Sequence, residues 1–388
     1  MWRDAAAGVR RAQTYPPPML PANEAECVLA DLHSIDEIEA LAKRHLSEVA
    51  YAYYAGAAGC ERTHARNRAA WESLSIWHRV MVDVSRRSTA TTLLDRPIAA
   101  PLFVAPTALH RMAHPDGELA TVRAVGSRGL GMALSSLATT SVEEVCAAAS
   151  GPVHFQLYIG MDRGFTKELV ERAISAGVAA LQLTVDTPVW GLRAREMRTG
   201  FRIPDGMSIV NLEALGAKVA RDHSGVGIGS ALGWTISPGL SWKDLEWLCG
   251  LSRVPVLVKG ICRADDALLA VRAGAGGIVV SNHGGRQLDG APPTAESLPR
   301  VAQAVAHRVP VLVDGGIRTG VDIFRALALG ATAVQVGRPI LWGLAAAGEL
   351  GVARVIDLLV QDFDRTMALA GCPIVGGITR DFIEPPRV

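Results

Sequence analysis

The sequence predicts an α/β fold in which eight β/α units close into a (β/α)8 barrel, and three observations support this. From residue 98 onward, eight short apolar runs alternate with amphipathic stretches. Each run is continuously apolar, as expected for parallel strands that are buried on both faces. Eight units also exceed the roughly five or six strands of most open doubly wound sheets. Finally, residues 253–260 recur almost unchanged as residues 308–315, although a doubly wound sheet could also show such a repeat.

The elements follow in order along one predicted domain, residues 31–388. Residues 1–30 lack periodicity and are expected to form a mobile tail. Ser34 and Glu37 form an S-x-x-E capping box, which predicts a helix from there to about Ala50. A long insertion at about residues 190–253 after the fourth strand is expected to act as an active-site lid, and Ser241 to Asp244 begin a helix at its end. The predicted strands are residues 98–105, 131–135, 153–158, 180–185, 255–259, 277–281, 310–313 and 332–336.

Composition and charge exclude several classes of protein. The 388 residues are 49% hydrophobic and 20% charged, which excludes a disordered chain. Lys plus Arg number 39 against 38 for Asp plus Glu, so nothing favours binding to nucleic acid or to an anionic membrane. No apolar run reaches the ~18 residues of a membrane span, and no signal peptide is evident. The six cysteines form no C-x-x-C pair and are expected to be reduced, so we expect a cytoplasmic protein without a metal site.

Polar side chains stand at the ends of nearly all predicted strands. The carboxyl ends of barrel strands meet at one face, where the reactive groups of such enzymes lie. A barrel with only a structural role would have little reason to bury so many polar groups together. The polar positions at the strand ends are Thr107, Ser135, Ser136, Gln156, Tyr158, Thr184, Asp186, Lys259, residues 281–286, residues 314–318 and residues 337–338.

The ends of the last two strands predict a phosphate site. Gly315, Gly316 and Arg318 follow the seventh strand, and Gly337 and Arg338 follow the eighth. Glycines allow the backbone to approach a phosphate closely, and the loops after strands seven and eight are the usual phosphate site of this fold. Either Gly-Arg alone would equally suit a tight turn beside a surface arginine. Together they indicate the phosphate of a planar cofactor that lies across the barrel mouth.

Several segments together resemble a known family. They are Tyr53-Tyr54 with Gly56, residues 105–108, 113–118, 156–158 and 183–188, and the run S-N-H-G-G-R-Q at residues 281–287. These segments resemble the FMN-dependent α-hydroxy acid oxidases and dehydrogenases, and the resemblance extends from about residue 34 to residue 380. It implies that the protein binds FMN and oxidises an (S)-2-hydroxy acid to the 2-oxo acid. The electron acceptor would be O2, which gives hydrogen peroxide, or a quinone or other acceptor. The resemblance also implies a homotetramer.

The resemblance assigns catalytic roles to His283 and Asp186. His283 would accept the substrate's hydroxyl proton as hydride leaves, or the α-proton in a carbanion route, and the sequence does not choose between the two. Asp186 would orient and charge the histidine. A lone histidine is more often structural, but this one follows a strand with an arginine three residues later.

The same resemblance identifies residues that would bind the substrate. Arg193 and Arg286 would hold the carboxylate, since planar guanidinium groups match it better than an ammonium does. Tyr53 would contact the carboxylate and Tyr158 the hydroxyl or ketone oxygen, although both tyrosines could simply pack as aromatic residues. The nearby arginines 195 and 198 compete with Arg193 for this role, but surface solvation is expected for them.

Other polar residues would bind the cofactor. Lys259 would stabilise negative charge on the reduced flavin, although a salt bridge inside the barrel is a rival interpretation. Ser135, Gln156 and Thr184 would pair with the edge of the ring system. The phosphate turns leave no room for an adenylate, so FMN rather than FAD is expected. The predicted cofactor-binding set is Pro106, Thr107, Ala108, Ser135, Gln156, Thr184, Lys259, Ser281, Asp314, Gly315, Gly316, Arg318, Gly337 and Arg338.

Three departures from the family pattern affect the predictions. Leu137 stands where glycolate oxidases carry Trp, which predicts a wider apolar pocket that prefers mandelate or longer 2-hydroxy acids to glycolate. Trp234 from the insertion could instead fill that space. Glu196 and Thr199 stand where relatives carry Asp and Asn. Arg193 is retained, but these two substitutions leave the conformation of the loop around it unpredicted. The sequence also lacks a C-terminal S-K-L peroxisomal signal.

Two functions of other classes compete with the oxidase. One is an FMN-barrel isomerase without net redox chemistry, against which the two carboxylate arginines argue. The other is a barrel that has lost catalysis and only binds a ligand, which the presence of His283, Asp186, Lys259 and Arg286 makes a poor explanation. Bleaching of the flavin by a 2-hydroxy acid would decide between these functions.

Overall fold

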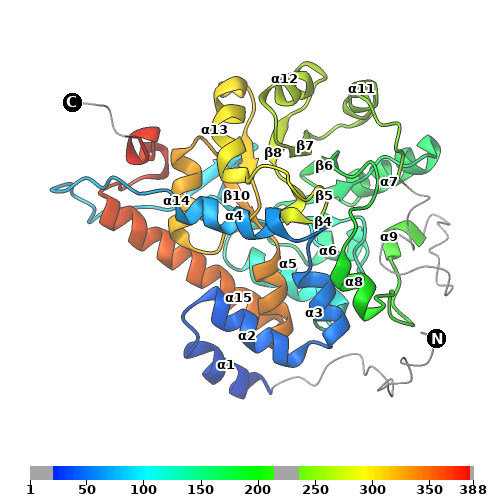
Figure 1. The fold of residues 1–388 in the computed structure, drawn as a ribbon, viewed down its shortest axis with the longest axis horizontal. Coiled ribbons are helices and arrows are strands. Elements are labelled where there is room, and N and C mark those ends of the chain that lie inside the picture. Colours follow the sequence, from blue (N-terminus) through cyan, green and yellow to red (C-terminus); the bar gives the residue numbers. More distant parts are fainter. Residues whose placement is uncertain (1–20, 214–235, 385–388) are drawn as a thin grey trace, which may run out of the picture.

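The computed structural model describes residues 21–213 and 236–384, and its centre is a closed barrel of eight parallel strands (Figure 1). The strands adjoin in the order β10-β3-β4-β5-β6-β7-β8-β9, so consecutive β/α units are neighbours. The predicted (β/α)8 barrel is therefore confirmed. Its strands are β3 (Leu102–Val104), β4 (Gly131–Ser135), β5 (Val153–Leu157), β6 (Ala180–Thr184), β7 (Val256–Ile261), β8 (Gly277–Val280), β9 (Val311–Val313) and β10 (Ala333–Val336).

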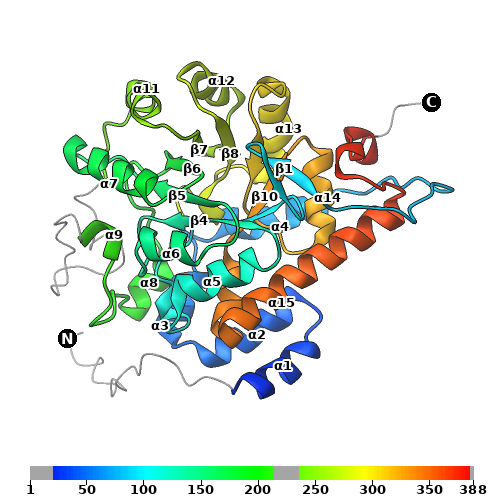
Figure 2. The same ribbon diagram turned by 180° about the vertical axis from the view of Figure 1, so that it is seen from behind.

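The first predicted strand was too long. Residues 98–105 do not form one strand, because Ile98 belongs to β2 (Arg96–Ile98), which pairs antiparallel with β1 (Thr91–Leu93). Leu93 and Ile98 are buried in one cluster with Phe103 and other side chains of the barrel strands. The short β1–β2 hairpin thus closes the amino-terminal end of the barrel, and it lies in front of the strands in Figure 2. An apolar run cannot distinguish such a plug from a strand by composition alone.

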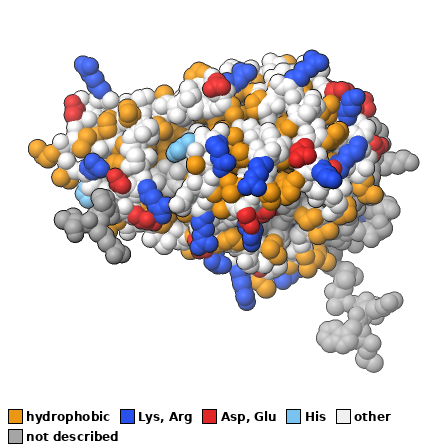
Figure 3. Space-filling view, turned by 90° about the horizontal axis from the view of Figure 1, so that it is seen from above, with side chains coloured by type: hydrophobic (Ala, Val, Ile, Leu, Met, Phe, Trp, Pro, Cys, Tyr) orange, Lys and Arg blue, Asp and Glu red, His pale blue; other side chains and the backbone are white. Residues whose placement is uncertain are grey.

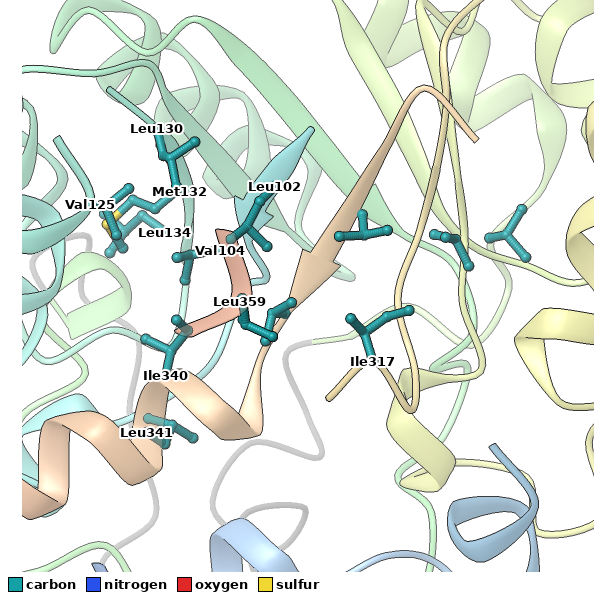
Figure 4. Packing of buried hydrophobic residues seen from close by; sticks show 14 of the residues in the cluster. Leu102, Val104, Val125, Leu130, Met132, Leu134, Ile317, Ile340, Leu341 and Leu359 are labelled. Atoms are coloured by element: carbon teal, nitrogen blue, oxygen red, sulfur yellow. The ribbon is translucent and has the colours of Figure 1, made fainter. Parts of the chain in front are cut away.

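Helices surround the barrel, and apolar side chains fill the layer between helices and strands. Leu102, Met132 and Leu134 from the strands lie near Val125 and Ile340 from the helices in Figure 4, and all are almost fully buried. The helices of this ring are α5 (Gly117–Gly126), α6 (Val142–Ala148), α7 (Arg163–Ser175), α11 (Trp242–Leu251), α12 (Ala264–Arg272), α13 (Thr294–Val305), α14 (Gly320–Ala328) and α15 (Arg338–Ala370).

The amino-terminal region differs from the prediction in two ways. Residues 22–30, expected within a mobile tail, form α1 (Ala22–Ala30), whose Ala25 and Leu29 are buried. The helix capped by Ser34 and Glu37 is confirmed as α2 (Ile35–His45), but it ends well before Ala50. It ends there because Ser47 caps a separate helix, α3 (Glu48–Ala55), by accepting a hydrogen bond from the Ala50 N–H.

The helices α3 and α4 (Arg62–Glu72) complete the carboxyl-terminal face of the barrel. Helix α3 carries Tyr53 to this face, and α4 lies across the strands in Figure 1. Asn67 of α4 and Asn282 after β8 exchange two side-chain hydrogen bonds of 2.9 and 2.7 Å, and both are buried. This pair fixes α4 to the loop that carries His283.

The long insertion after β6 is shorter than predicted. It contains α8 (Ala194–Thr199) and α9 (Val210–Glu213), whereas α11 belongs to the helical ring and begins at the expected Ser241–Asp244 capping box. The insertion therefore ends before Trp242 rather than at residue 253. Trp234, the residue that could fill the space beside Leu137, lies outside the described residues.

The surface carries mixed charge. On the face in Figure 3, basic and acidic side chains alternate among apolar ones, in agreement with the formal net charge of +1. Among the described residues, no helix is both long enough and apolar enough to cross a membrane.

Candidate active site

A pocket with an empty volume of about 980 Å³, its open mouth included, lies at the carboxyl-terminal ends of the barrel strands. The structure brings the predicted site residues together there. All of them line this pocket except Asp186 and Ser281, which contact lining residues from behind. The predicted residues in its wall are Tyr53, Pro106, Thr107, Ala108, Ser135, Leu137, Gln156, Tyr158, Thr184, Arg193, Lys259, His283, Arg286, Asp314, Gly315, Gly316, Arg318, Gly337 and Arg338.

His283 and Asp186 form a hydrogen-bonded pair. The histidine Nδ1 lies 2.8 Å from Oδ1 of Asp186, so Nε2 is the ring nitrogen that remains for a substrate. His283 has a left-handed backbone with φ of 59°, which a non-glycine residue adopts only when its surroundings hold it there. The Ser281 hydroxyl supports this turn by accepting a hydrogen bond of 3.0 Å from the His283 N–H.

Burial and charge give the pair its resting protonation state. Burial lowers the pKa of His283 below its usual value, although the Asp186 carboxylate partly opposes this. Burial disfavours ionisation of Asp186 as well, but the positive charges of His283 and Lys259 hold its pKa below the usual value. At neutral pH a neutral histidine therefore lies beside an ionised carboxylate, an arrangement that can accept a proton and stabilise the imidazolium formed.

These directions predict the pH dependence of catalysis. If His283 is the catalytic base, it works only when unprotonated, so kcat/KM should fall as the pH drops through the His283 pKa, at a pH below the ordinary ~6.5. Replacing Asp186 with Asn removes the charge that raises this pKa, so the acid limb should move to still lower pH while the rate falls. Profiles of kcat/KM for parent and variant test this, and a limb that moves to higher pH would contradict it.

Arg193 and Arg286 lie together at one side of the pocket. Arg286 donates to the backbone carbonyls of Tyr53 and Gly56, both at 2.7 Å. Arg193 donates through Nε to the backbone carbonyl of Arg286 at 3.2 Å. The competing arginines point elsewhere: Arg195 pairs with Glu61 and is not a lining residue, and Arg198 is exposed.

Three aromatic residues, Tyr53, Tyr158 and Trp190, line the space next to these arginines, and Phe201 lies behind Tyr53. Tyr53 stacks on Phe201 with ring centroids 4.3 Å apart. The Arg286 guanidinium also lies over the Tyr53 ring, 5.2 Å from its centroid. Tyr158 meets Trp190 edge to face at 5.9 Å. Burial raises the pKa of Tyr53 to about 12 and that of Tyr158 further, so both phenols remain protonated hydrogen-bond donors at neutral pH.

A connected row of polar side chains crosses the floor of the pocket. The Ser135 hydroxyl donates to the Gln156 carbonyl at 3.1 Å, and the Gln156 amide donates to the Thr184 hydroxyl at 3.0 Å. Lys259 extends from β7, donates to the Ser281 hydroxyl at 2.9 Å and pairs with Asp314 at 3.0 Å. The salt bridge inside the barrel therefore exists, and Lys259 still lines the pocket.

The opposite end of the pocket has unbalanced positive charge. Arg338 donates to the carbonyls of Tyr54, Gly56 and Gly284, and Arg318 to that of Ile317. Within residues 21–213 and 236–384 neither guanidinium forms an ion pair, and burial lowers the pKa of both. Two half-buried cations without a counter-charge form a site for an anion.

The backbone before Arg318 can accommodate only glycine at position 316. Gly316 has φ of 90°, and a Cβ atom there would lie 2.6 Å from the Asn67 carbonyl oxygen. Gly316 therefore lines the pocket with bare backbone, as the predicted phosphate site requires.

The residues present fit FMN. A phosphate dianion would neutralise Arg318 and Arg338, and the polar row on the floor would pair with the edge of a planar ring. Both side-chain amide atoms of Gln335 and one oxygen of Asp314 are buried in this wall without a hydrogen-bond partner in the described chain. Such groups are costly unless a ligand or water pairs with them.

Comparisons with known proteins agree with this geometry. Residues 42–385 match the model of the FMN-dependent dehydrogenase family. The chain is 47% identical to an L-lactate oxidase from a Nostoc species, covering 90% of this chain and 97% of that protein. It is 45% identical to glycolate oxidase 1 from Zea mays, covering 92% and 96%. A crystal structure of mandelate oxidase superimposes with a TM-score of 0.86 at 40% identity, covering 90% of this chain and 98% of that one.

The fold and the site thus define a flavin-dependent oxidoreductase built on a (β/α)8 barrel. The chain belongs to the FMN-dependent dehydrogenase family and is an oxidoreductase of the 2-hydroxy acid oxidase type, with FMN as its cofactor.

The residues of the site that were not among the predicted ones include Trp190, Gln335 and Glu196. Trp190 lines the pocket from the insertion, Gln335 lines it from β10, and Glu196 lies behind Arg193 and Arg286. Gln335 interrupts an otherwise apolar strand, and this was the available signal. In the sequence Glu196 stands out only as a departure from the family pattern, because chain order does not show which arginines a carboxylate will meet.

Proposed function

We propose that this protein oxidises an (S)-2-hydroxy acid to the corresponding 2-oxo acid and passes the electrons to O2, giving hydrogen peroxide. One observation carries the proposal: His283, paired with Asp186 behind it, lines the same pocket as Arg193 and Arg286. A base and a carboxylate clamp at one end of a flavin pocket suit a substrate that carries a carboxylate beside an oxidisable hydroxyl.

In this proposal each residue of the pocket has a separate role in the oxidation. Arg193, Arg286 and the Tyr53 phenol bind the substrate carboxylate, and Tyr158 donates a hydrogen bond to the hydroxyl oxygen. Nε2 of His283 accepts the hydroxyl proton, and Asp186 stabilises the resulting imidazolium. FMN, when bound, would supply the two-electron acceptor, and Lys259 would stabilise negative charge on its ring. The substrate loses two electrons and two protons, and O2 takes up the same number as it becomes hydrogen peroxide.

The names of the relatives support an oxygen-using enzyme, since the lactate, glycolate and mandelate proteins are all called oxidases. A dehydrogenase that uses a quinone or another acceptor is the alternative within the same chemistry. An isomerase without net redox chemistry would not need two arginines and a tyrosine at a carboxylate. A barrel that only binds a ligand would not need a neutral histidine supported by a carboxylate.

Anaerobic mixing of the holoenzyme with 2-hydroxy acids tests the proposal. The flavin absorbance should bleach with the (S)-acids and return on admission of air, with one hydrogen peroxide formed per 2-oxo acid. Bleaching without reoxidation by air would establish the alternative acceptor. Absence of bleaching by every 2-hydroxy acid would overturn the proposal.

Leu137 supports a preference for medium or large apolar substrates. It is 5% exposed, lines the pocket, and has its backbone fixed by the Ser135 hydroxyl and by the Leu109 N–H. Trp190, whose buried indole N–H has no partner in the described chain, lies in the same wall and limits how wide the space is.

We predict that Leu137→Trp shifts specificity towards small substrates. Each methylene in an apolar pocket changes the activation free energy by ~1–3 kcal/mol, so the ratio of kcat/KM for mandelate over glycolate should fall by roughly 10- to 100-fold. The test measures kcat/KM for glycolate, lactate, 2-hydroxyoctanoate and mandelate in both proteins, with Leu137→Ile as the control of similar volume. An unchanged ranking, or a parent that prefers glycolate, would show that Leu137 does not set substrate size.

We also propose a homotetramer in the cytoplasm. Trp77, Val80 and Met81 are 58%, 73% and 101% exposed on one loop, which is unfavourable unless another surface covers them. Light scattering should give four times the chain mass of 41.0 kDa, and the mass of a single chain would contradict it.

A further inference from the structure

We propose that Glu196 balances the charge of the two substrate arginines and thereby restricts the site to monocarboxylates. This inference rests on the proposed function, since it concerns the side of the pocket that would bind the substrate carboxylate. Glu196 would not touch the substrate: it is a positioning residue that acts through Arg193 and Arg286.

The geometry of Glu196 is specific. Its Oε1 accepts a hydrogen bond from Nη1 of Arg193 at 3.0 Å and one from Nη2 of Arg286 at 3.3 Å. The Glu196 side chain is only 4% exposed, as is that of Arg193, and Arg286 is 15% exposed. One buried carboxylate oxygen therefore joins the two guanidinium groups.

The local fold explains why this residue reaches both partners. Arg193 precedes α8 as its N-cap residue, and Glu196 lies three residues later in the first turn, so their side chains share one face. Arg286 belongs to the loop after β8, and its backbone carbonyl accepts a hydrogen bond from Arg193. This contact brings the Arg286 side chain next to Glu196.

The charges in the pocket then match one substrate carboxylate. Lys259 is neutralised by Asp314, and Arg318 and Arg338 face the cofactor phosphate. Arg193, Arg286 and Glu196 together carry a net charge of +1, and the ionised Asp186 behind His283 adds a further negative charge on this side. A monocarboxylate neutralises the three linked groups, whereas a dicarboxylate would leave a buried negative charge unpaired.

Two isosteric probes measure this restriction without turnover. Oxamate carries one negative charge, and oxalate of nearly the same shape carries two. Their dissociation constants can be measured in the holoenzyme from the change that each ligand causes in the flavin absorbance. In the parent, we expect oxamate to bind at least as tightly as oxalate.

Three variants separate charge from geometry. Glu196→Gln keeps the shape and removes the charge, so both probes should bind more tightly, and the affinity for oxalate relative to oxamate should rise at least tenfold. Glu196→Asp keeps the charge on a shorter side chain and should retain the parent ratio. Glu61→Gln removes the partner of Arg195 outside the pocket and serves as the matched control.

Turnover gives a second readout. In Glu196→Gln, kcat/KM for the diacid (S)-malate should rise at least tenfold relative to (S)-2-hydroxybutyrate. An unchanged oxalate-to-oxamate ratio in a Glu196→Gln protein that still binds both probes would overturn the charge-balancing role alone. Failure of the parent to bind either probe, together with absence of bleaching by 2-hydroxy acids, would overturn the proposed function itself.

Discussion

Replacing His283 with Ala should slow flavin reduction by the substrate at least ~10²-fold, the low end for loss of a general base. FMN should remain bound, because Arg318, Arg338 and Gly316 hold the other end of the pocket. Substrate affinity should change only modestly, since the arginines proposed to bind the carboxylate stay in place. Anaerobic stopped-flow measurement of flavin bleaching gives the rate, and a substrate titration gives the affinity.

The backbone at His283 calls for a second variant. Its left-handed conformation is as unfavourable for Ala as for most residues, whereas Asn adopts it more readily. His283→Asn should therefore fold at least as well as His283→Ala and be equally slow. A parent-like reduction rate in either variant would show that His283 is not the base.

Replacing Arg286 with Lys should weaken substrate binding as well as catalysis. The planar guanidinium, which can bind a carboxylate through two N–H groups, is replaced by an ammonium group that acts as a point charge. The hydrogen bonds of Arg286 to the Tyr53 and Gly56 carbonyls are also lost. Hydrogen bonds to charged groups contribute ~1.5–3 kcal/mol each, so KM should rise roughly 10- to 100-fold.

The matched control for this change is Arg195→Lys, two residues beyond Arg193 and paired with Glu61 outside the pocket. It should leave KM within about twofold of the parent, as most surface substitutions do. Thermal unfolding of both holoenzymes checks that the folds are comparable. An Arg286→Lys protein with the parent KM would exclude Arg286 from carboxylate binding.

Much of the fold and the site was open to prediction because the signals are local. Seven of the eight barrel strands lie within two residues of their predicted bounds, since a strand buried on both faces must be apolar throughout. The site residues stand at strand ends, so the closure of the barrel brings them to one face. The run from Ser281 to Gln287 also resembles its family closely enough to indicate the cofactor.

Long-range packing decided the rest. The β1–β2 hairpin packs against the amino-terminal end of the barrel. Residues 22–30 form a helix because Ala25 and Leu29 are buried against distant elements. Glu196 was visible in the sequence only as a substitution in a loop. Its link between Arg193 and Arg286 exists because the loop after β6 and the loop after β8 meet over the pocket. The sequence by itself therefore determined the barrel, the cofactor class and which side chains meet at the pocket. The tertiary structure alone decided which charges become partners, because ion pairing depends on distances that chain order does not contain.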